Sequence, residues 1–572
     1  MGHTHADLAA QELDRVAEEM FRGQLAWSPL YASQVGYPGY AGTLPDVTVA
    51  GEERRKAELE RLRDRAAAVT ADQLDDDRRI TREVLLRAIS DALVGLAASS
   101  PDYTVTPLPH TGSAATVMIS FPKSSLRTSE DAEGYLERCA KVPAWLTAAQ
   151  ERLDIGRVSG RFPVRRLVLA AVEQVDAYLS VPVAEDPLLT VSAPAEGDPP
   201  GWRDRVAAAV DEQVRPALAR YRDHLVAEVL PTSRPDETPG LAALPDGAAL
   251  YQQLAAGHTT TDHSVDELHE LGLSLVADLT EEMRERGSRT LGSADFAEIT
   301  RRLRTDADLR FDSAEEMLAE ARATLARAQE ALPRWLGRVP DVGCEVLEQS
   351  VYEAENGNLG YYQWPSVDGD RPGRFWLNTY KPTTRMRFEL QGLTFHESVP
   401  GHHTQLALLW ELPELCAFRR HARATAFTEG WALYTERLAD EMGLYTSEVA
   451  KLGMVSFDFW RACRLVVDTG MHAHGWSRER AVRFMMDHSA LTRKNVENEI
   501  DRYIAWPGQA LGYMVGRLEI ARLRAETERR LGAAFDIRAF HDALLGHGNL
   551  PLTVLARVVD DFVESHEAAN GG

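Results

Sequence analysis

The stretch Leu393–Gln405 reads LTFHESVPGHHTQ, and the chemistry of the chain is concentrated there. It places His396, Glu397, His402 and His403 within eight residues. A second motif, AFTEGWALYTE, follows about thirty residues later and carries Glu429 in an apolar and aromatic setting. Imidazoles and carboxylates are the usual ligands of catalytic zinc. The two motifs therefore predict a mononuclear metal site with a general base beside it.

The first motif begins like the zinc-protease pattern HExxH but departs from it at the second histidine. Position i+4 from His396 is Pro400, and the next histidines are His402 and His403 at i+6 and i+7. On an ideal helix, i+6 lies about 120° away from the face of His396, and i+7 lies roughly 10.5 Å further along. Pro400 and Gly401 are residues at which a helix kinks or bulges. We read the motif as HExxH with a two-residue insertion; His402 is the preferred second ligand, and His403 is either the ligand instead or a supporting group.

Three motifs together resemble a known bacterial family. They are HESVPGHH from His396, EGWALYTE from Glu429 and PGQALGY from Pro507. They resemble the family called "domain of unknown function 885", whose members are usually described as zinc metallopeptidases. That family is in turn similar to the helical glutamate-zincins, such as angiotensin-converting enzyme and the thermostable carboxypeptidases. The likeness is specific from about Val351 to Leu552 and rests on length and helical character before that.

The resemblance implies a role for each residue of the two motifs. His396 and His402 (or His403) would be the histidine ligands of one zinc ion per chain, and Glu429, on a following helix, would be the third ligand. Glu397 would be the general base. Glu436 comes seven residues after Glu429 and therefore shares its helical face. We expect Glu436 to support the ligands or to form an ion pair.

Two further candidates would stabilise negative charge on the reacting group. Helical zincins supply a tyrosine from a late helix for this purpose, and Tyr513 is the candidate here, with Tyr503 as the second choice. His472 follows Asp468 at spacing i, i+4, so the two side chains can form a hydrogen bond on one helical face. A histidine oriented in this way suits either a supporting role near the metal or stabilisation of an oxyanion.

Apolar residues at helical spacing over most of the chain predict a mostly α fold. With the resemblance, this indicates a large zincin-like helical body with a deep cleft. We expect an N-terminal helical region, 1–240, and a catalytic region, 241–572, within one continuous structural unit. The proline-rich segment from Pro231 to Asp246 marks the softest boundary.

The pattern changes after Pro333. The segments CEVLEQSVY (344–352) and GRFWLNTY (373–380) alternate between apolar and polar residues as strands do. They predict a small antiparallel sheet beside the helix that carries His396. An exposed sheet edge can bind an extended peptide by strand addition. Candidate substrate contacts in this region are Tyr361, Tyr362, Trp364 and Asn378.

Composition excludes several other classes of protein. The 572 residues include 87 acidic and 63 basic side chains, and the net charge of −24 argues against a nucleic-acid partner. The four cysteines have no CxxC spacing, which favours reduced thiols over disulfides or a cysteine metal site. The N-terminus lacks a basic region followed by an apolar run, and the apolar runs are shorter than the ~20 residues of a membrane span. We therefore expect no membrane partner and a cytoplasmic location.

The predicted function is zinc-dependent hydrolysis of amide bonds in short peptides, with Glu397 as the general base. Two alternatives remain open. One is a metal-dependent amidase or deacylase that acts on a small metabolite with the same residues. The other is a non-catalytic helical binding protein whose interrupted motif holds no metal. The retention of Glu397 beside His396 argues against the second alternative, because binding alone requires no general base.

Overall fold

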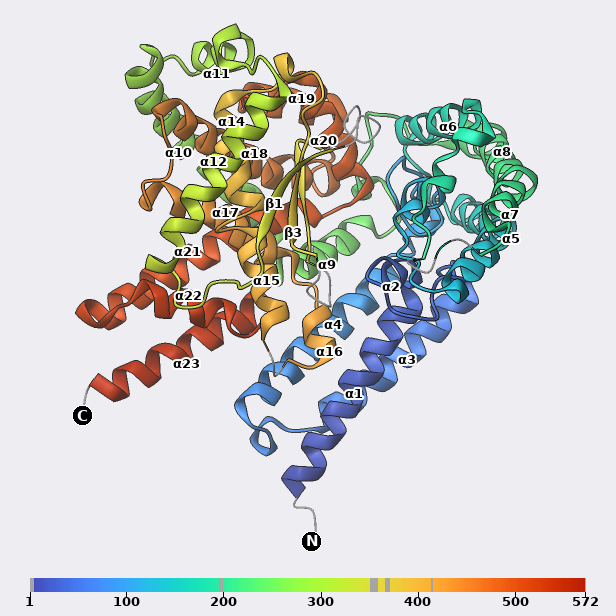
Figure 1. The fold of residues 1–572 in the computed structure, drawn as a ribbon, viewed down its shortest axis with the longest axis horizontal. Coiled ribbons are helices and arrows are strands. Elements are labelled where there is room, and N and C mark those ends of the chain that lie inside the picture. The colour runs from blue at the N-terminus through green and yellow to red at the C-terminus, as the bar shows by residue number, and fades with distance from the viewer. Residues whose placement is uncertain are drawn as a thin grey trace. The chain divides into compact units, whose positions relative to one another are not determined.

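The fold is described from a computed structural model of the chain. The structure describes residues 5–194, 197, 199–349, 358–365, 371–412 and 415–570. The chain divides into two compact units, Met1–Tyr251 with Gly475–Glu479, and Gln252–His474 with Arg480–Gly572. The division between Tyr251 and Gln252 falls inside one helix, α9 (Gly247–Thr259). Figure 1 labels most elements of both units.

The first unit consists of helices joined by short turns. Its helices are α1 (His5–Trp27), α2 (Pro29–Gln34), α3 (Val49–Ala68), α4 (Asp76–Ala97), α5 (Ser129–Val158), α6 (Arg165–Ser180), α7 (Trp202–Ala209) and α8 (Arg215–His224). Side-chain caps fix several helix starts: Asp75 accepts a hydrogen bond from the backbone N–H of Arg78, and Thr128 and Asp131 form a reciprocal capping box. Trp202 is fully buried and donates from its indole to the carbonyl of Ala132. The core of this unit is therefore built on the packing of α7 against α5.

One helix of the first unit has the length and composition of a membrane span. It lies within Asp76–Asp102 and includes α4. The sequence expectation differed because it considered uninterrupted apolar runs, whereas this helix is apolar only on average. Core helices of soluble proteins have the same properties, and α4 contributes buried side chains such as Val84, Leu85 and Ile89 to the interior of its unit.

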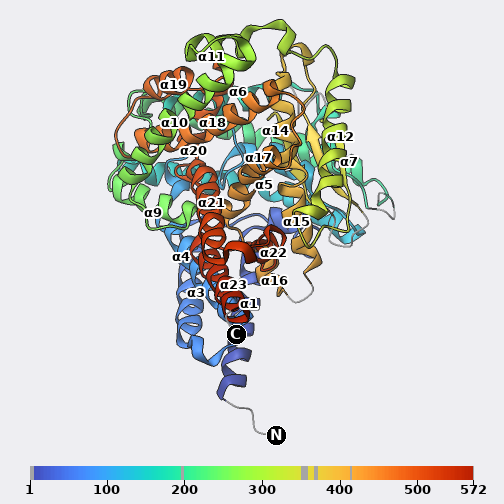
Figure 2. The ribbon, with the colours of Figure 1, turned by 90° about the vertical axis from the view of Figure 1, so that its left-hand side faces the viewer.

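The second unit carries all the predicted site residues and can be followed in Figure 2. Its helices after α9 are α10 (Val265–Leu291), α11 (Phe296–Thr305), α12 (Ala314–Ala331), α14 (Arg387–Glu397), α15 (His402–Glu411), α16 (Ala417–His421), α17 (Thr425–Glu441), α18 (Glu448–His472), α19 (Arg478–Asp487), α20 (Arg493–Ala505), α21 (Gly512–Leu531), α22 (Ile537–Leu545) and α23 (Leu552–Asn570). The prediction of a mostly α fold is confirmed.

Helices α17 and α21 pack unusually closely, and glycines make this possible. A Cβ atom at Gly430 would lie 2.6 Å from the Cα of Gly516, and one at Gly516 would lie 1.7 Å from the carbonyl oxygen of Ala426. Neither separation is possible between real atoms, so both positions require glycine. This close packing brings Tyr513, next to Gly512 at the start of α21, toward α17.

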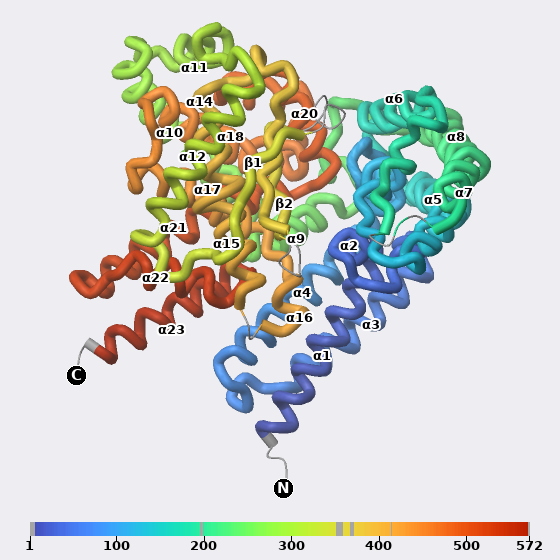
Figure 3. The backbone as a smooth tube through the Cα atoms, in the orientation of Figure 1, coloured from blue at the N-terminus to red at the C-terminus, as the bar shows by residue number. Residues whose placement is uncertain are grey.

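A three-stranded sheet precedes α14. Its strands are β1 (Cys344–Glu348), β2 (Gly360–Gln363) and β3 (Gly373–Leu377), arranged in the order β1-β3-β2. Strand β1 is labelled in Figures 1 and 3, and β2 in Figure 3. β2 pairs with β3 antiparallel, but β1 pairs with β3 in parallel. The sheet is therefore mixed and not antiparallel throughout.

The difference from the predicted sheet has a simple topological cause. Consecutive strands do reverse direction, but β3 lies between β1 and β2, so β1 meets the strand that runs the same way. The middle strand in sequence, β2, was expected to be part of a connecting segment. Residues 350–352 of the predicted first strand lie outside the described part of the chain.

Candidate metal centre

The helix that carries His396 ends where the sequence predicts an interruption. Helix α14 stops at Glu397, and α15 begins at His402. Between them, a Cβ atom at Gly401 would lie 2.1 Å from the carbonyl oxygen of His396, so only glycine fits. The indole of Trp431 on α17 donates to the carbonyl of Pro400 at 3.0 Å and holds the connection in place. The predicted break at Pro400 and Gly401 is confirmed.

This break brings three candidate ligands together. The Nε2 atoms of His396 and His402 lie 3.5 and 3.4 Å from Oε2 of Glu429. The three potential ligand atoms all lie within 4.8 Å of one another, and the two imidazole rings are nearly perpendicular, at 83°. His396 and His402 are buried, and the Glu429 side chain is 21% exposed.

The two nitrogen-to-carboxylate spacings fit a tetrahedral ion, whereas histidine nitrogens as far apart as 4.8 Å would have to move closer together around it. Ligand atoms about 2.1 Å from zinc lie about 3.4 Å from one another at the corners of a tetrahedron. The nitrogen-to-carboxylate distances of 3.4 and 3.5 Å match that edge, and they exceed the length of a strong charge-assisted hydrogen bond. The donor set, two imidazoles and one carboxylate, is one that catalytic zinc uses.

A fourth residue orients the first ligand. Nδ1 of His396 donates to Oε1 of Glu436 at 2.8 Å, and the Glu436 side chain is fully buried. Glu429 and Glu436 lie seven residues apart on α17, so they meet the same imidazole from one helical face. With its proton on Nδ1, a neutral His396 presents the Nε2 lone pair to the other two ligands. This is the arrangement that usually supports a metal-binding histidine. A guanidinium nitrogen of Arg461 lies 3.8 Å from the same Glu436 oxygen.

Opposite charges hold these side chains together. Burial would lower the pKa of His396, but the hydrogen bonds to Glu429 and Glu436 outweigh it and raise the pKa to about 9. Burial would raise the pKa of Glu429, but the two histidines hold it well below its usual range. A metal cation, which carries a greater charge than a proton, can replace the proton that His396 holds among the atoms of His396, His402 and Glu429.

Glu397 lies next to the three candidate ligands, and its carboxylate forms no hydrogen bond or ion pair with the described residues. It is the last residue of α14 and is half-buried. Burial raises the pKa of its carboxyl, and the nearby charges of His396 and His402 oppose the rise. None of the described residues donates a hydrogen bond to this carboxylate. Its position and freedom suit a general base.

His403 is directed elsewhere, although it adjoins His402 in sequence. Its Nδ1 lies 2.9 Å from the hydroxyl of Tyr362 on β2, and its Nε2 lies 3.1 Å from the carbonyl oxygen of Val342. Burial lowers the pKa of His403 to about 4, so the ring is neutral; Nε2 donates to Val342, and Nδ1 accepts from Tyr362. Both nitrogens are engaged, and the metal-ligand prediction for His403 is corrected: the residue holds the sheet against α15.

Tyr513 lies in the neighbourhood of Glu429. Burial raises the pKa of Tyr513, and the negative charge of Glu429 raises it further. The guanidinium of Arg464 on α18 stacks 4.2 Å from the centre of the Tyr513 ring and fixes its position. The second tyrosine candidate, Tyr503, is instead fully buried, and its hydroxyl donates to Glu499 and accepts from Arg464. Tyr513 is the tyrosine that the fold brings toward the group.

His472 connects α18 with α20 and is not one of the three candidate ligands. Its Nε2 donates to the carbonyl of Tyr503 on α20 at 3.1 Å and lies 3.9 Å from Asp468. The other oxygen of Asp468 accepts from the backbone N–H of Gly508, just before α21. The predicted Asp468–His472 proximity therefore exists, but both side chains are used to connect α18 with the segment that leads to α21.

Sequence reasoning did not identify Arg461, Arg464 or Trp431 as members of the site. Each is a large residue on a helix whose pattern already indicated burial, and a buried arginine on an apolar helix was the one available signal. Their partners come from other helices, so no local pattern could have assigned them.

Comparisons with known proteins agree with the resemblance seen in the motifs. The model of the family described as "Bacterial protein of unknown function (DUF885)" matches residues 29–559. The fold is similar to that of a protein from Colwellia psychrerythraea described as a "putative lipoprotein". Its TM-score is 0.89 and its identity 26%, over 97% of this chain and 100% of that one. A protein from Shewanella oneidensis with the same description and unknown function has a TM-score of 0.75 at 19% identity, over 96% of this chain and 99% of that one. The second likeness shows the fold alone. No curated protein matches the sequence.

Proposed function

Because the chain belongs to a bacterial family of unknown function (DUF885), we propose its activity from the site itself: zinc-dependent hydrolysis of amide bonds in short peptides. The observation that carries this proposal is the convergence of His396, His402 and Glu429 within 4.8 Å. A carboxylate that orients the first histidine and a second, unpaired carboxylate at the end of α14 support it.

His396, His402 and Glu429 would hold the ion. When bound there, zinc supplies Lewis acidity, which polarises a carbonyl and lowers the pKa of a water molecule. Glu436 keeps His396 in the tautomer that binds metal, and Arg461 balances the charge of Glu436. With three protein ligands, the ion would keep a position open for water or substrate, as catalytic zinc does in other proteins.

The other residues would move protons and stabilise charge. Glu397 takes a proton from the attacking water and returns it to the nitrogen of the leaving amine, so the amide C–N bond breaks and acid and amine form. The hydroxyl of Tyr513 donates a hydrogen bond to the oxygen that becomes negative in the tetrahedral intermediate. This scheme needs no covalent enzyme intermediate.

The sheet beside α14 favours a peptide substrate. β2 is an edge strand of the described sheet, and an edge strand can pair with an extended peptide. The hydrogen bond between Tyr362 on β2 and His403 ties this strand to the residue after the second ligand. A peptide on β2 would therefore run close to the metal group.

A second candidate function is hydrolysis of a small amide or acyl metabolite by the same residues. A cavity of about 410 Å³ lies along α14, and a cavity of this size suits a small molecule or a very short peptide. Peptide and metabolite panels separate the two functions.

Hydrolysis tests the proposal directly. Zinc-loaded protein is incubated with a mixed library of tetra- to hexapeptides and with a panel of acylated amino acids, and products are identified by mass spectrometry. Cleavage that stops in the presence of a chelator, returns with added zinc and is absent from Glu397→Gln supports the proposal. Zinc-loaded protein that cleaves neither panel contradicts it and favours the binding protein.

The cytoplasmic location stays a prediction from the sequence. The similar protein from Colwellia psychrerythraea is described as a "putative lipoprotein", and that description favours export and attachment to the cell envelope. Fractionation of cells into cytoplasm, membrane and periplasm decides between the two locations.

A further inference from the structure

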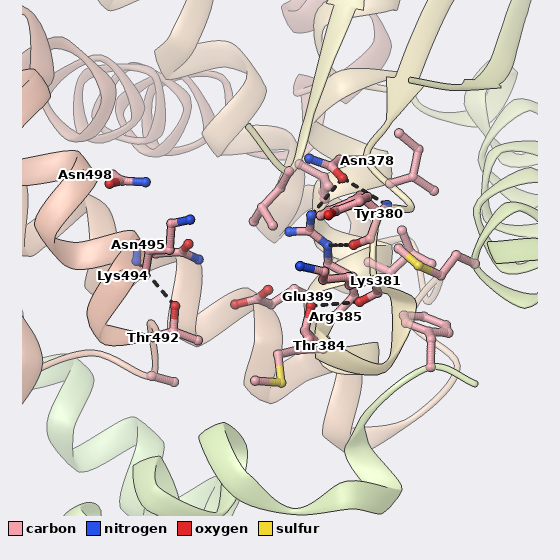
Figure 4. Close-up of a pocket in the computed structure, with 18 residues that line it drawn as sticks. Asn378, Tyr380, Lys381, Thr384, Arg385, Glu389, Thr492, Lys494, Asn495 and Asn498 are labelled. Carbon is pink, nitrogen blue, oxygen red and sulfur yellow. Dashed lines mark hydrogen bonds between the residues drawn. The ribbon is translucent and has the colours of Figure 1, made fainter. Parts of the chain in front are cut away.

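A cavity of about 410 Å³ is lined in part by α14 and lies entirely within the second unit. We name it the α14 cavity and define it by Asn378, Lys381, Arg385, Glu389, Leu393 and Lys494. Figure 4 shows Lys494 and Asn495 from the start of α20 facing Lys381, Arg385 and Glu389 across an open space. The floor is apolar, with side chains such as Phe311 and Leu390.

Three cations and one acid line this cavity. Among the described residues, Lys381, Arg385 and Lys494 supply the positive charges, and none of them forms an ion pair within 4.0 Å. The acid is Glu389, whose charge acts on Arg385. Unpaired positive charge in a concave, partly apolar site attracts a small anion.

Two hydrogen bonds fix the Arg385 side chain in the cavity. Its Nη2 donates to Oδ1 of Asn378 at 2.7 Å, and its Nε donates to the carbonyl of Tyr380 at 3.1 Å. Both acceptors are neutral, so they orient the guanidinium without neutralising it. A guanidinium held in this way matches the planar geometry of a carboxylate.

Glu389, the one acid among the described residues that line the cavity, is compatible with an anionic ligand. Its side chain is buried, and burial raises the pKa of Glu389 to about 7 against the opposing charges of Arg385 and Arg461. A protonated carboxyl donates a hydrogen bond to a carboxylate and does not repel it.

The cavity and the proposed metal group share one helix, α14. Glu389 and Leu393 line it, and Glu397 comes one turn after Leu393 on the same helical face. The positive charge of Arg461 opposes the rise in the pKa of both Glu389 and Glu397, so Arg461 lies near both carboxyls. The rise from Glu389 to Glu397 is about 12 Å on a helix, and an extended peptide covers that distance in roughly three or four residues.

From this geometry we propose that the α14 cavity binds a free carboxylate of the substrate, with Arg385 as the main specificity-determining residue and Lys381 and Lys494 assisting. The inference rests on the proposed function and deepens it: the substrate class is short peptides with a free C-terminal carboxylate. The cleaved bond lies two to four residues before that end. Apolar side chains near the C-terminus pack on the floor of the cavity.

Equilibrium binding tests the inference separately from catalysis. The probe is acetyl-Ala-Ala-Phe-Leu-Ala with a free carboxylate, compared with the same peptide ending in a carboxamide. Both are titrated calorimetrically into zinc-loaded Glu397→Gln, which holds the peptide without cleaving it. We expect the free acid to bind about tenfold or more tightly than the amide, as for other hydrogen bonds between charged groups.

Two variants in the same background locate the effect. Arg385→Gln should remove the preference for the free acid, and Lys494→Gln, at an exposed position, should reduce it about threefold. Arg493→Gln is the matched control: it removes a positive charge one residue away, on a side chain that pairs with Glu497 and does not line the cavity. It should leave the preference unchanged.

Equal binding of acid and amide to the Glu397→Gln protein would overturn the inference. So would a preference that survives in both Arg385→Gln and Lys494→Gln. Failure of the proposed function looks different: the wild-type protein would cleave neither peptide, while the binding preference and its dependence on Arg385 would persist.

Discussion

Nδ1 of His396 on α14 and Oε1 of Glu436 on α17 are 2.8 Å apart, joined by a hydrogen bond that is closed off from solvent. The same helix supplies Glu429 to the other side of the imidazole, 3.5 Å from Nε2. One helix therefore orients the first candidate ligand and provides another. The position of α17 is in turn set by its close glycine packing against α21.

Removing the charge of Glu436 should weaken zinc binding without abolishing it. Glu436→Gln keeps the shape of the side chain but lowers the basicity of His396, and loss of such a supporting carboxylate typically costs 10- to 100-fold in metal affinity. Competition with a chromophoric chelator measures the change. Glu441→Gln, at the exposed end of the same helix, is the control. Identical affinities in the wild type and Glu436→Gln would show that this hydrogen bond is irrelevant to the metal.

The Gly401→Ala substitution should disrupt the site although it changes no ligand. The new Cβ would collide with the carbonyl oxygens of His396 and Phe395, at 2.1 and 2.4 Å, so the link between α14 and α15 must move. We expect zinc to be lost and the melting temperature to fall by several degrees, since backbone strain costs about 1–3 kcal/mol. Gly95→Ala, in the last turn of α4 where no other atom lies within 4 Å of the new Cβ, serves as the comparison and should be neutral or slightly stabilising. A Gly401→Ala protein with normal zinc content would be incompatible with the close fit at this turn.

Tyr513→Phe should separate charge stabilisation from metal binding. The phenyl ring keeps the stacking with Arg464, but the donor to the oxyanion is gone. Loss of one such donor typically lowers kcat about 10²- to 10³-fold. Steady-state kinetics on any peptide found to be cleaved measures this, with zinc content as the control for an intact site. Tyr513 would have no catalytic part if kcat were unchanged.

Loss of the Glu389 proton should lower the free energy of unfolding as the pH rises. Its pKa in the folded protein is raised by burial from 4.5 to about 7, so the folded chain holds this proton more tightly than the unfolded chain. The stabilisation is complete below about pH 4.5 and is lost as the pH rises through about 7. Glu389→Gln stays neutral throughout, so its free energy of unfolding relative to wild type should increase between pH 5 and pH 8.

The expected change in this difference in the free energy of unfolding is on the order of 3 kcal/mol, because the pKa of Glu389 is raised from 4.5 to about 7. Denaturant unfolding of both proteins at the two pH values measures it, because taking the difference between them cancels all other titrating groups. A difference that does not vary with pH would mean that Glu389 is charged in the folded protein.

Much of the candidate centre follows from the sequence because its signals are local. The donor types, the Pro400–Gly401 break and the seven-residue spacing of Glu429 and Glu436 all follow from single-helix geometry. Each of these expectations matches the structure. The periodicity of apolar residues also predicts the mostly α fold and the presence of a sheet before α14.

What the sequence left open depends on distant partners. The motif favours His402 but leaves His403 open as the second ligand, and only the placement of Tyr362 and Val342 turns His403 away. The order of strands in the sheet likewise depends on which neighbour β3 meets. The α14 cavity combines the loop after β3 with the start of α20, segments more than a hundred residues apart, so no single stretch of sequence indicates it.

The most direct test of the proposed centre compares the zinc content of two adjacent variants. His402→Ala and His403→Ala are purified without chelator beside the wild type, and zinc is measured by inductively coupled plasma mass spectrometry. The proposed site predicts about one zinc per chain in the wild type and in His403→Ala, and almost none in His402→Ala. Loss of zinc in His403→Ala with retention in His402→Ala, or a wild-type protein that binds no zinc even when it is added, would contradict it.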